Sequence, residues 1–198
     1  MTATLTQKIE KMTFEQYLSF NDGTDTCYEL VDGVLVEMNP PRGEHIEVTN
    51  FLYRTLDRAI EQKGLPWVVR WDYGIRTGVS RSRIADLTVM TEDQRDACLA
   101  TSAVLEEPPI LVVEIVSPDD PARDYRYKRS EYAAKGIPEY WIVDLSQPQF
   151  VVLRLEEGFY EEAIFQGSIP ILSPTFPELE LTVDQIIAAS RPRKRSGS

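Results

Sequence analysis

The chain has 198 residues, which suits one domain with a full hydrophobic core, and its formal net charge of −11 disfavours non-specific binding to nucleic acid. A single histidine, His45, disfavours a histidine-rich zinc site, and two cysteines without metal-ligand spacing are typical of a reducing compartment. No segment is apolar enough to cross a membrane and no signal-peptide pattern opens the chain, so we expect a cytoplasmic protein.

The first part of the chain predicts a helix, a hairpin and a longer helix. A Thr-x-x-Gln capping box at 13–16 opens a short helix. Residues 28–38 predict a hairpin around Asp32-Gly33, which places Leu30 opposite Leu35. Apolar residues at helical spacing then predict a helix over 44–62 that ends at Gly64.

The next part predicts two strands and a surface helix. Residues 67–76 alternate loosely and predict one strand, and 84–90 predict another that contains Asp86. A second capping box, at 91–94, opens a short helix. Arginines at 70, 76, 81 and 83 indicate a locally basic surface, although such charges usually form a solvated face.

The carboxy-terminal part predicts a second hairpin, over 150–155 and 159–165, and a last short helix opened by a capping box at 182–185. Neither a repeat nor a linker interrupts the chain. We therefore expect one domain over residues 12–189, with flexible tails at 1–11 and 190–198.

The stretch from 109 to 144 contains the most informative pattern. Residues 110–116 are apolar except for Glu114, which predicts a strand covered on both faces. An acidic cap and Pro121 then start a helix that runs to about Lys135 and stops at Gly136. Residues 139–144 form a second apolar strand, so the unit predicts a right-handed crossover and a parallel pair. Glu114 lies near the carboxyl end of its strand, where open α/β sheets place ligands.

Each charged residue in this region also has a structural interpretation. A buried Glu114 needs a cation, and a lysine or arginine partner explains it as well as a metal does. Asp86 alone is typical of a strand-end carboxylate that accepts backbone amides. Lys128 alone is typical of a solvated helix lysine.

Taken in chain order, these predicted elements and sequence motifs resemble the core of the PD-(D/E)XK nuclease superfamily and, in detail, its Uma-two family of restriction-endonuclease-like domains. The matching words span roughly residues 12–185 and are YELVDGVLVEM, His45 at a helix start, the strand around Asp86, LVVEIVSP, the D-x-x-x-K-x-x-x-Y helix, and GIPEYWIVD. The sequence departs from the superfamily at Ala85, where the motif has proline, and at Val116, where it has lysine. The resemblance implies that the lysine has migrated to Lys128.

The resemblance implies a metal-dependent site. Asp86, Glu114 and the backbone carbonyl of Ile115 would bind Mg²⁺ or Mn²⁺, which prefer oxygen ligands. Lys128 would orient water or stabilise charge on phosphate. Possible accessory residues are Glu29, His45, Asp124 and Tyr132, the last two sharing one helix face with Lys128.

We therefore expect an α/β, restriction-endonuclease-like mixed sheet flanked by helices, with an added β-hairpin at each end. The expected function is Mg²⁺-dependent hydrolysis of phosphodiester bonds in DNA by a homodimer that pairs through the hairpin at 150–165. Two alternatives stay open: a catalytically inactive nucleic-acid-binding or assembly module on the same fold, and a purely structural homodimer.

Overall fold

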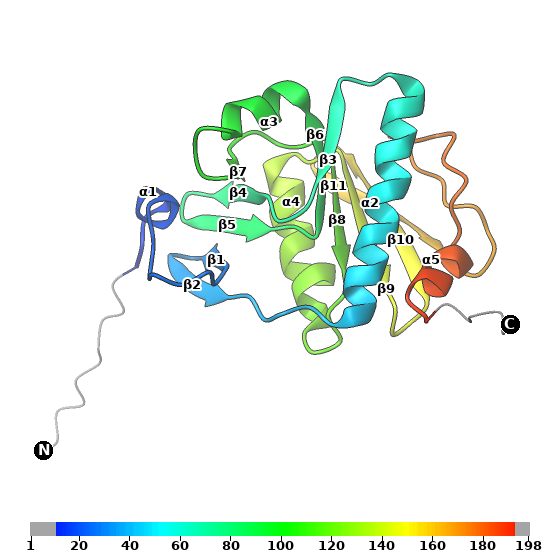
Figure 1. Cartoon of the computed structure of the whole chain (residues 1–198), viewed down its shortest axis with the longest axis horizontal. Helices are drawn as coiled ribbons and strands as arrows, with labels where there is room; N and C mark the ends of the chain where they lie inside the picture. Colours follow the sequence, from blue (N-terminus) through cyan, green and yellow to red (C-terminus); the bar gives the residue numbers. More distant parts are fainter. Residues whose placement is uncertain (1–10, 193–198) are drawn as a thin grey trace, which may run out of the picture.

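The computed structural model describes residues 11–192, which form two sheets and the helices around them (Figure 1). The larger sheet has six strands in the order β11-β10-β9-β8-β6-β3. Its strands are β3 (Trp67–Arg70), β6 (Leu87–Thr91), β8 (Leu111–Ile115), β9 (Glu139–Asp144), β10 (Gln149–Glu156) and β11 (Phe159–Phe165). β8 and β9 pair in parallel, as the crossover predicts, and the other neighbours are antiparallel.

The smaller sheet has five strands in the order β2-β1-β5-β4-β7. Its strands are β1 (Tyr28–Val31), β2 (Val34–Glu37), β4 (Gly74–Gly78), β5 (Arg81–Ile84) and β7 (Val104–Leu105). It lies beside the larger sheet, with α1 (Phe14–Leu18) at its outer end (Figure 1). The chain passes directly from one sheet to the other on either side of β4 and β5.

Helices cover both faces of the larger sheet. On one face lie α2 (Gly43–Lys63) and α5 (Val183–Ala189); on the other lies a continuous helix made of the π-helical η1 (Arg123–Lys128) and α4 (Arg129–Lys135). The remaining short helix, α3 (Glu92–Cys98), follows β6. Within residues 11–192 no helix is long and apolar enough to cross a bilayer.

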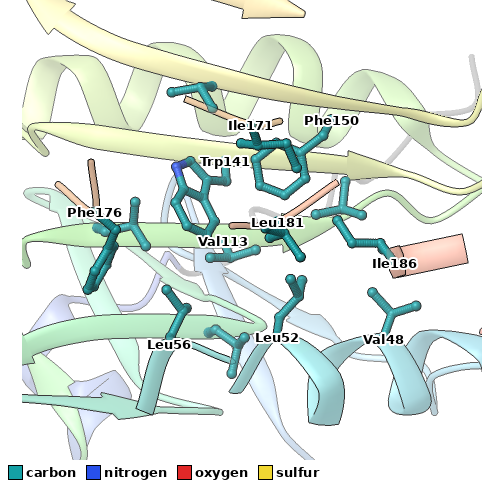
Figure 2. Close-up of a cluster of buried hydrophobic side chains, with 14 of the residues drawn as sticks. Val48, Leu52, Leu56, Val113, Trp141, Phe150, Ile171, Phe176, Leu181 and Ile186 are labelled. Atoms are coloured by element: carbon teal, nitrogen blue, oxygen red, sulfur yellow. The ribbon is translucent and has the colours of Figure 1, made fainter. Parts of the chain in front are cut away.

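The face under α2 is a dry apolar core. Val48, Leu52 and Leu56 of α2 point toward Val113, Trp141 and Phe150 of the sheet (Figure 2). Because successive strand residues face opposite sides, Val113 enters this core while its neighbour Glu114 faces α4. A single strand thus supplies both the core and the charged residue.

Most of the predicted elements are present. The hairpin pairs Leu30 with Leu35, all three capping boxes form, and the helix after Glu114 ends at Gly136 in a left-handed conformation with φ 84°. The fold class is the expected one: the hairpin β10–β11 extends the six-stranded sheet, whereas the hairpin β1–β2 belongs to the smaller sheet. The predicted tails fall mainly on residues 1–10 and 193–198, which lie outside the described residues.

Two predicted strands are wrong. The strand over 67–76 is divided at Trp71–Tyr73 into β3 and β4, which belong to different sheets. The strand over 84–90 is likewise divided, and Asp86 lies in the bend between β5 and β6. The alternation of apolar and polar residues shows which face a residue occupies but does not show which sheet its strand joins. It therefore did not predict that the chain crosses between the sheets at these two points.

Candidate functional site

Seven predicted site residues converge between the two sheets and the η1–α4 helix. Glu29 comes from β1, His45 from the first turn of α2, Asp86 from the bend before β6 and Glu114 from β8. Asp124, Lys128 and Tyr132 come from successive turns of the η1–α4 helix. Hydrogen bonds and ion pairs join five of them into one network, Glu29, Glu114, Asp124, Lys128 and Tyr132. His45 and Asp86 form a separate pair beside it, and Asp86 also accepts from the backbone N–H of Ile115, the residue after Glu114.

Glu114 occupies the interior of this network and is only 2% exposed. Its Oε2 lies 2.8 Å from Lys128 Nζ, and the Tyr132 hydroxyl donates to its Oε1 at 2.6 Å. Burial, together with the carboxylates of Asp86 and Asp124, raises the pKa of Glu114 to about 8 against the lowering effect of Lys128. The site therefore holds more negative charge than its lysine neutralises.

Lys128 is buried, with 1% of its surface exposed, so the solvated-lysine interpretation is wrong. Besides Glu114, its Nζ lies 3.6 Å from both Glu29 Oε1 and Asp124 Oδ1. Burial lowers the pKa of Lys128, but these three carboxylates raise it further, and the net pKa is above its usual range. A permanent cation is thus fixed beside Glu114.

Asp86 and His45 are the part of the site that reaches solvent, since their side chains are 19% and 20% exposed, and this pair is called the mouth of the site. His45 Nε2 lies 2.9 Å from Asp86 Oδ1, and the backbone N–H of Ile115 donates to Asp86 Oδ2 at 2.6 Å. Burial raises the pKa of Asp86, but His45, Lys128 and this N–H lower it further. Burial lowers the pKa of His45, and Asp86 more than reverses this. Asp86 does accept a backbone amide, as its structural interpretation expects, while it also faces the mouth.

Asp124 has an unusual environment for a buried carboxylate. It is 1% exposed, and neither of its oxygens accepts a hydrogen bond within the described part of the chain. Burial, helped by the Asp86 and Glu29 carboxylates, raises its pKa despite the nearby cations of Lys128 and Arg123. A buried carboxylate without donors is a place where a cation or an ordered water fits.

A second set of buried charges supports the network from behind, and the sequence did not reveal it. Arg83 of β5 forms two hydrogen bonds with Glu131 of α4, at 2.6 and 2.9 Å, and one with Glu29 at 2.9 Å. Glu29 is itself buried, on a strand that lies between β2 and β5 in the smaller sheet. One signal was available: Glu131 follows Lys128 by three residues and therefore lies on the same helix face.

The donor types and the charge balance fit a divalent cation. Carboxylates outnumber permanent cations: Glu29, Asp86, Glu114, Asp124 and Glu131 face Arg83, Arg123 and Lys128. Within residues 11–192, however, no group of three His, Cys, Asp or Glu side chains is arranged to hold a metal. The expected ligand set uses two carboxylates and a backbone carbonyl, and the oxygens of both carboxylates are already hydrogen-bonded. Metal binding would exchange some of these contacts.

Comparisons with known proteins agree with this fold. The model of the Uma2 family, described as "Putative restriction endonuclease", matches residues 14–184. A crystal structure from Anabaena variabilis ATCC 29413, described as a putative nuclease belonging to DUF820, has a TM-score of 0.76 at 16% identity, covering 91% of this chain and 99% of that one. This likeness shows the fold.

A looser likeness is to the type IIG restriction endonuclease BpuSI, with 13% identity over 77% of this chain and 17% of that one. Its TM-score of 0.38 is too low to establish a common fold. A search of curated proteins found no match.

Proposed function

Because this chain belongs to the Uma2 family, we propose that it is a metal-dependent endonuclease that hydrolyses phosphodiester bonds of DNA. The observation that carries the proposal is the buried Lys128, whose Nζ lies 2.8 Å from Glu114, next to the Ile115 backbone N–H that binds Asp86. A buried cation beside two carboxylates, at a mouth that opens to solvent, is an arrangement that binds and polarises phosphate.

Asp86, Glu114 and the carbonyl of Ile115 would hold Mg²⁺ or Mn²⁺. Such an ion neutralises phosphate charge and lowers the pKa of an attacking water. Asp86 is presented by two contacts, from His45 and from the Ile115 N–H, that fix its carboxylate near the end of β8.

The remaining residues of the network position protons and charge. Lys128 keeps its proton and supplies a fixed positive charge for water or for a phosphate oxygen. His45 holds the Asp86 carboxylate through its Nε2 at the mouth, and this contact raises the pKa of the imidazole against the lowering effect of burial. Tyr132 holds Glu114 by its hydroxyl and so restricts the rotation of that carboxylate.

The decisive experiment is DNA cleavage by Glu114→Gln. A glutamine can accept from Lys128 and donate to the Tyr132 oxygen, so the fold is retained while a charged ligand is lost. We expect the wild type to cut plasmid or single-stranded DNA with Mg²⁺ or Mn²⁺, and the variant to be inactive. Lys135→Met, on the same helix but away from the network, is the matched control and should cut normally.

Calorimetry with Mn²⁺ tests the metal directly. Wild type should bind the ion more tightly than Glu114→Gln, because two carboxylates are better ligands than one. Equal affinity would show that Glu114 does not bind the metal.

Lys128→Met is a useful second variant, with an expected loss of about 10²–10³ in the rate of cleavage. Its folding must be checked because Lys128 is buried.

One observation favours a second candidate, the catalytically inactive nucleic-acid-binding module. Glu114 is already paired with Lys128, and both Asp86 oxygens are already hydrogen-bonded. In that case DNA would bind with a clear salt dependence, but neither Mg²⁺ nor Mn²⁺ would produce cleavage.

We also propose a homodimer formed through β11. This strand is the edge of the six-stranded sheet, and Phe159 and Ile164 on it are 77% and 55% exposed. Pairing of two copies would cover an open strand edge and give two sites for two DNA strands. Light scattering at micromolar concentration tests this, and Ile164→Lys should shift the protein toward a monomer.

A further inference from the structure

An aromatic pair that the proposed chemistry does not use lies beside the mouth of the site. Trp71 follows β3, where the chain leaves the larger sheet, and it is 51% exposed. Its ring meets the ring of Tyr53 of α2 edge to face, with centroids 4.8 Å apart. Tyr53 thus fixes the orientation of an indole that still offers half of its surface to solvent.

The turn that carries Trp71 has an unusual backbone. Asp72 has φ 57°, a left-handed conformation that few residues other than glycine adopt, although aspartate tolerates it better than most. It lies in the connection between the end of β3 at Arg70 and the start of β4 at Gly74, where Trp71 packs on Tyr53 of α2. Such backbone conformations are often retained where function depends on the local geometry.

The aromatic pair is aligned with the mouth of the site. His45, Thr49 and Tyr53 are spaced four residues apart, so they share one face of α2, and the eight residues from His45 to Tyr53 span about 12 Å. Asp72 is also near Asp86, because the carbonyl of the next residue, Tyr73, accepts a hydrogen bond from the backbone N–H of Ala85 at 3.3 Å. A strand with a phosphate at the mouth therefore reaches Trp71 within a few nucleotides.

We propose that Trp71, supported by Tyr53, stacks on an unpaired base of the nucleic-acid strand whose phosphate enters the site, so that single-stranded or locally opened DNA is the preferred substrate. This inference rests on the proposed endonuclease function. The net charge of −11 weakens the phosphate attraction that supplies most non-specific binding. Stacking on an aromatic ring does not depend on net charge and is available for every base.

Binding of a labelled single-stranded oligonucleotide, measured by fluorescence anisotropy in the Glu114→Gln background, tests the proposal without cleavage. Trp71→Ala should weaken binding by about 5- to 100-fold, and Trp71→Phe should retain most of the affinity. The matched control is Phe20→Ala, which removes another exposed aromatic ring that also meets a tyrosine, Tyr28, edge to face, with centroids 5.7 Å apart. It should bind as the background does.

Moving one abasic nucleotide along the oligonucleotide locates the stacked base. At one position the missing base should weaken binding to the protein that contains Trp71. The same lesion should not weaken binding to Trp71→Ala any further, because the two changes remove the same contact. In cleavage assays with Glu114 intact, Trp71→Ala should raise KM and leave kcat within about twofold.

The outcomes separate this inference from the function on which it rests. If the wild type neither binds nor cuts any DNA, both fail. If the wild type cuts DNA and Trp71→Ala binds as tightly as its background, the endonuclease stands and the stacking proposal is wrong. If Trp71→Ala weakens duplex and single strand equally, Trp71 contacts the backbone and the preference for an unpaired base is overturned.

Discussion

The two faces of the six-stranded sheet each bury a glutamate, but they satisfy it by different means. On the α2 face, Glu139 of β9 is 1% exposed and accepts from Trp141 Nε1, Ser173 Oγ, and the N–H and hydroxyl of Thr175, at 2.5–2.8 Å. On the α4 face, Glu114 of the adjacent strand β8 is held by the Lys128 cation and one hydroxyl.

The difference distinguishes a structural carboxylate from one suited to an exchangeable ligand. Every oxygen of Glu139 is satisfied by neutral donors, and these contacts join residues 173–175 to the sheet. Glu114 instead shares one lysine with Glu29 and Asp124, so negative charge is in excess around it. An excess of this kind is typical of sites that bind a cation or a charged substrate.

The largest expected effect comes from breaking the charge network behind Glu114. Arg83→Met leaves Glu29 and Glu131 buried without their shared cation, and we expect a loss of about 3–5 kcal/mol in the free energy of unfolding. Arg81→Met, on the same strand but paired with the exposed Asp32, should cost less than about 1 kcal/mol. Urea unfolding of both variants checks this. Similar losses would mean that the buried pairs add nothing specific.

Glu139→Gln should be the next most damaging change. Either orientation of the amide turns an NH₂ group toward a donor that cannot accept, Trp141 Nε1 or the Thr175 N–H, so at least one buried hydrogen bond is lost. Losing a hydrogen bond to a charged group and leaving its donor unpaired costs about 2–4 kcal/mol. Urea unfolding measures it, and an unchanged midpoint would show that the donors rearrange around the amide.

The sequence predicted this site better than it predicted the sheets around it. The four-residue spacing of Asp124, Lys128 and Tyr132 placed all three on the face that meets Glu114, and the structure brings them there even though η1 is a π-helix. Helical spacing depends only on the local conformation of the chain, so it predicts which residues share a face even when the surface they meet is unknown.

The sequence patterns missed contacts between residues that lie far apart in the chain. Arg83 and Glu131 are charged residues that would normally be solvated. The helical spacing places Glu131 on the face of Lys128, but nothing in either segment shows that β5 of the smaller sheet meets α4 there. The breaks at Asp72 and Asp86 were missed for a similar reason, because apolar and polar residues continue to alternate across both. Which strand pairs with which is decided by tertiary contacts.

A smaller effect on stability is expected for Glu114→Gln, the counterpart of Glu139→Gln. The glutamine carbonyl can accept from Lys128 and its NH₂ can donate to the Tyr132 oxygen, because a hydroxyl both donates and accepts. We expect a change of about 1 kcal/mol or less in the free energy of unfolding, with loss of cleavage. A loss as large as that of Glu139→Gln would show that the ionic pair itself holds the fold together.

The smallest effect is expected for Asp124→Asn, and its sign is informative. Because the pKa of Asp124 is raised in the folded protein, this carboxyl favours folding most strongly below its unfolded-state pKa, and that contribution is lost as the pH rises through the folded-state pKa. At neutral pH the buried charge, which has no hydrogen-bond donor among residues 11–192, therefore opposes folding, although Lys128 and Arg123 offset part of the penalty.

Asparagine removes that charge, so the variant should be as stable as the wild type or up to about 1 kcal/mol more stable at pH 7, with a smaller advantage at pH 4. Asp119→Asn, which changes an exposed carboxylate four residues before η1, is the control and should be neutral at both pH values. Urea unfolding at the two pH values measures these changes. If Asp124→Asn lost about 3 kcal/mol or more in the free energy of unfolding at pH 7, Asp124 would be a required counter-charge for Lys128. The excess of negative charge that distinguishes this face of the sheet would then not exist.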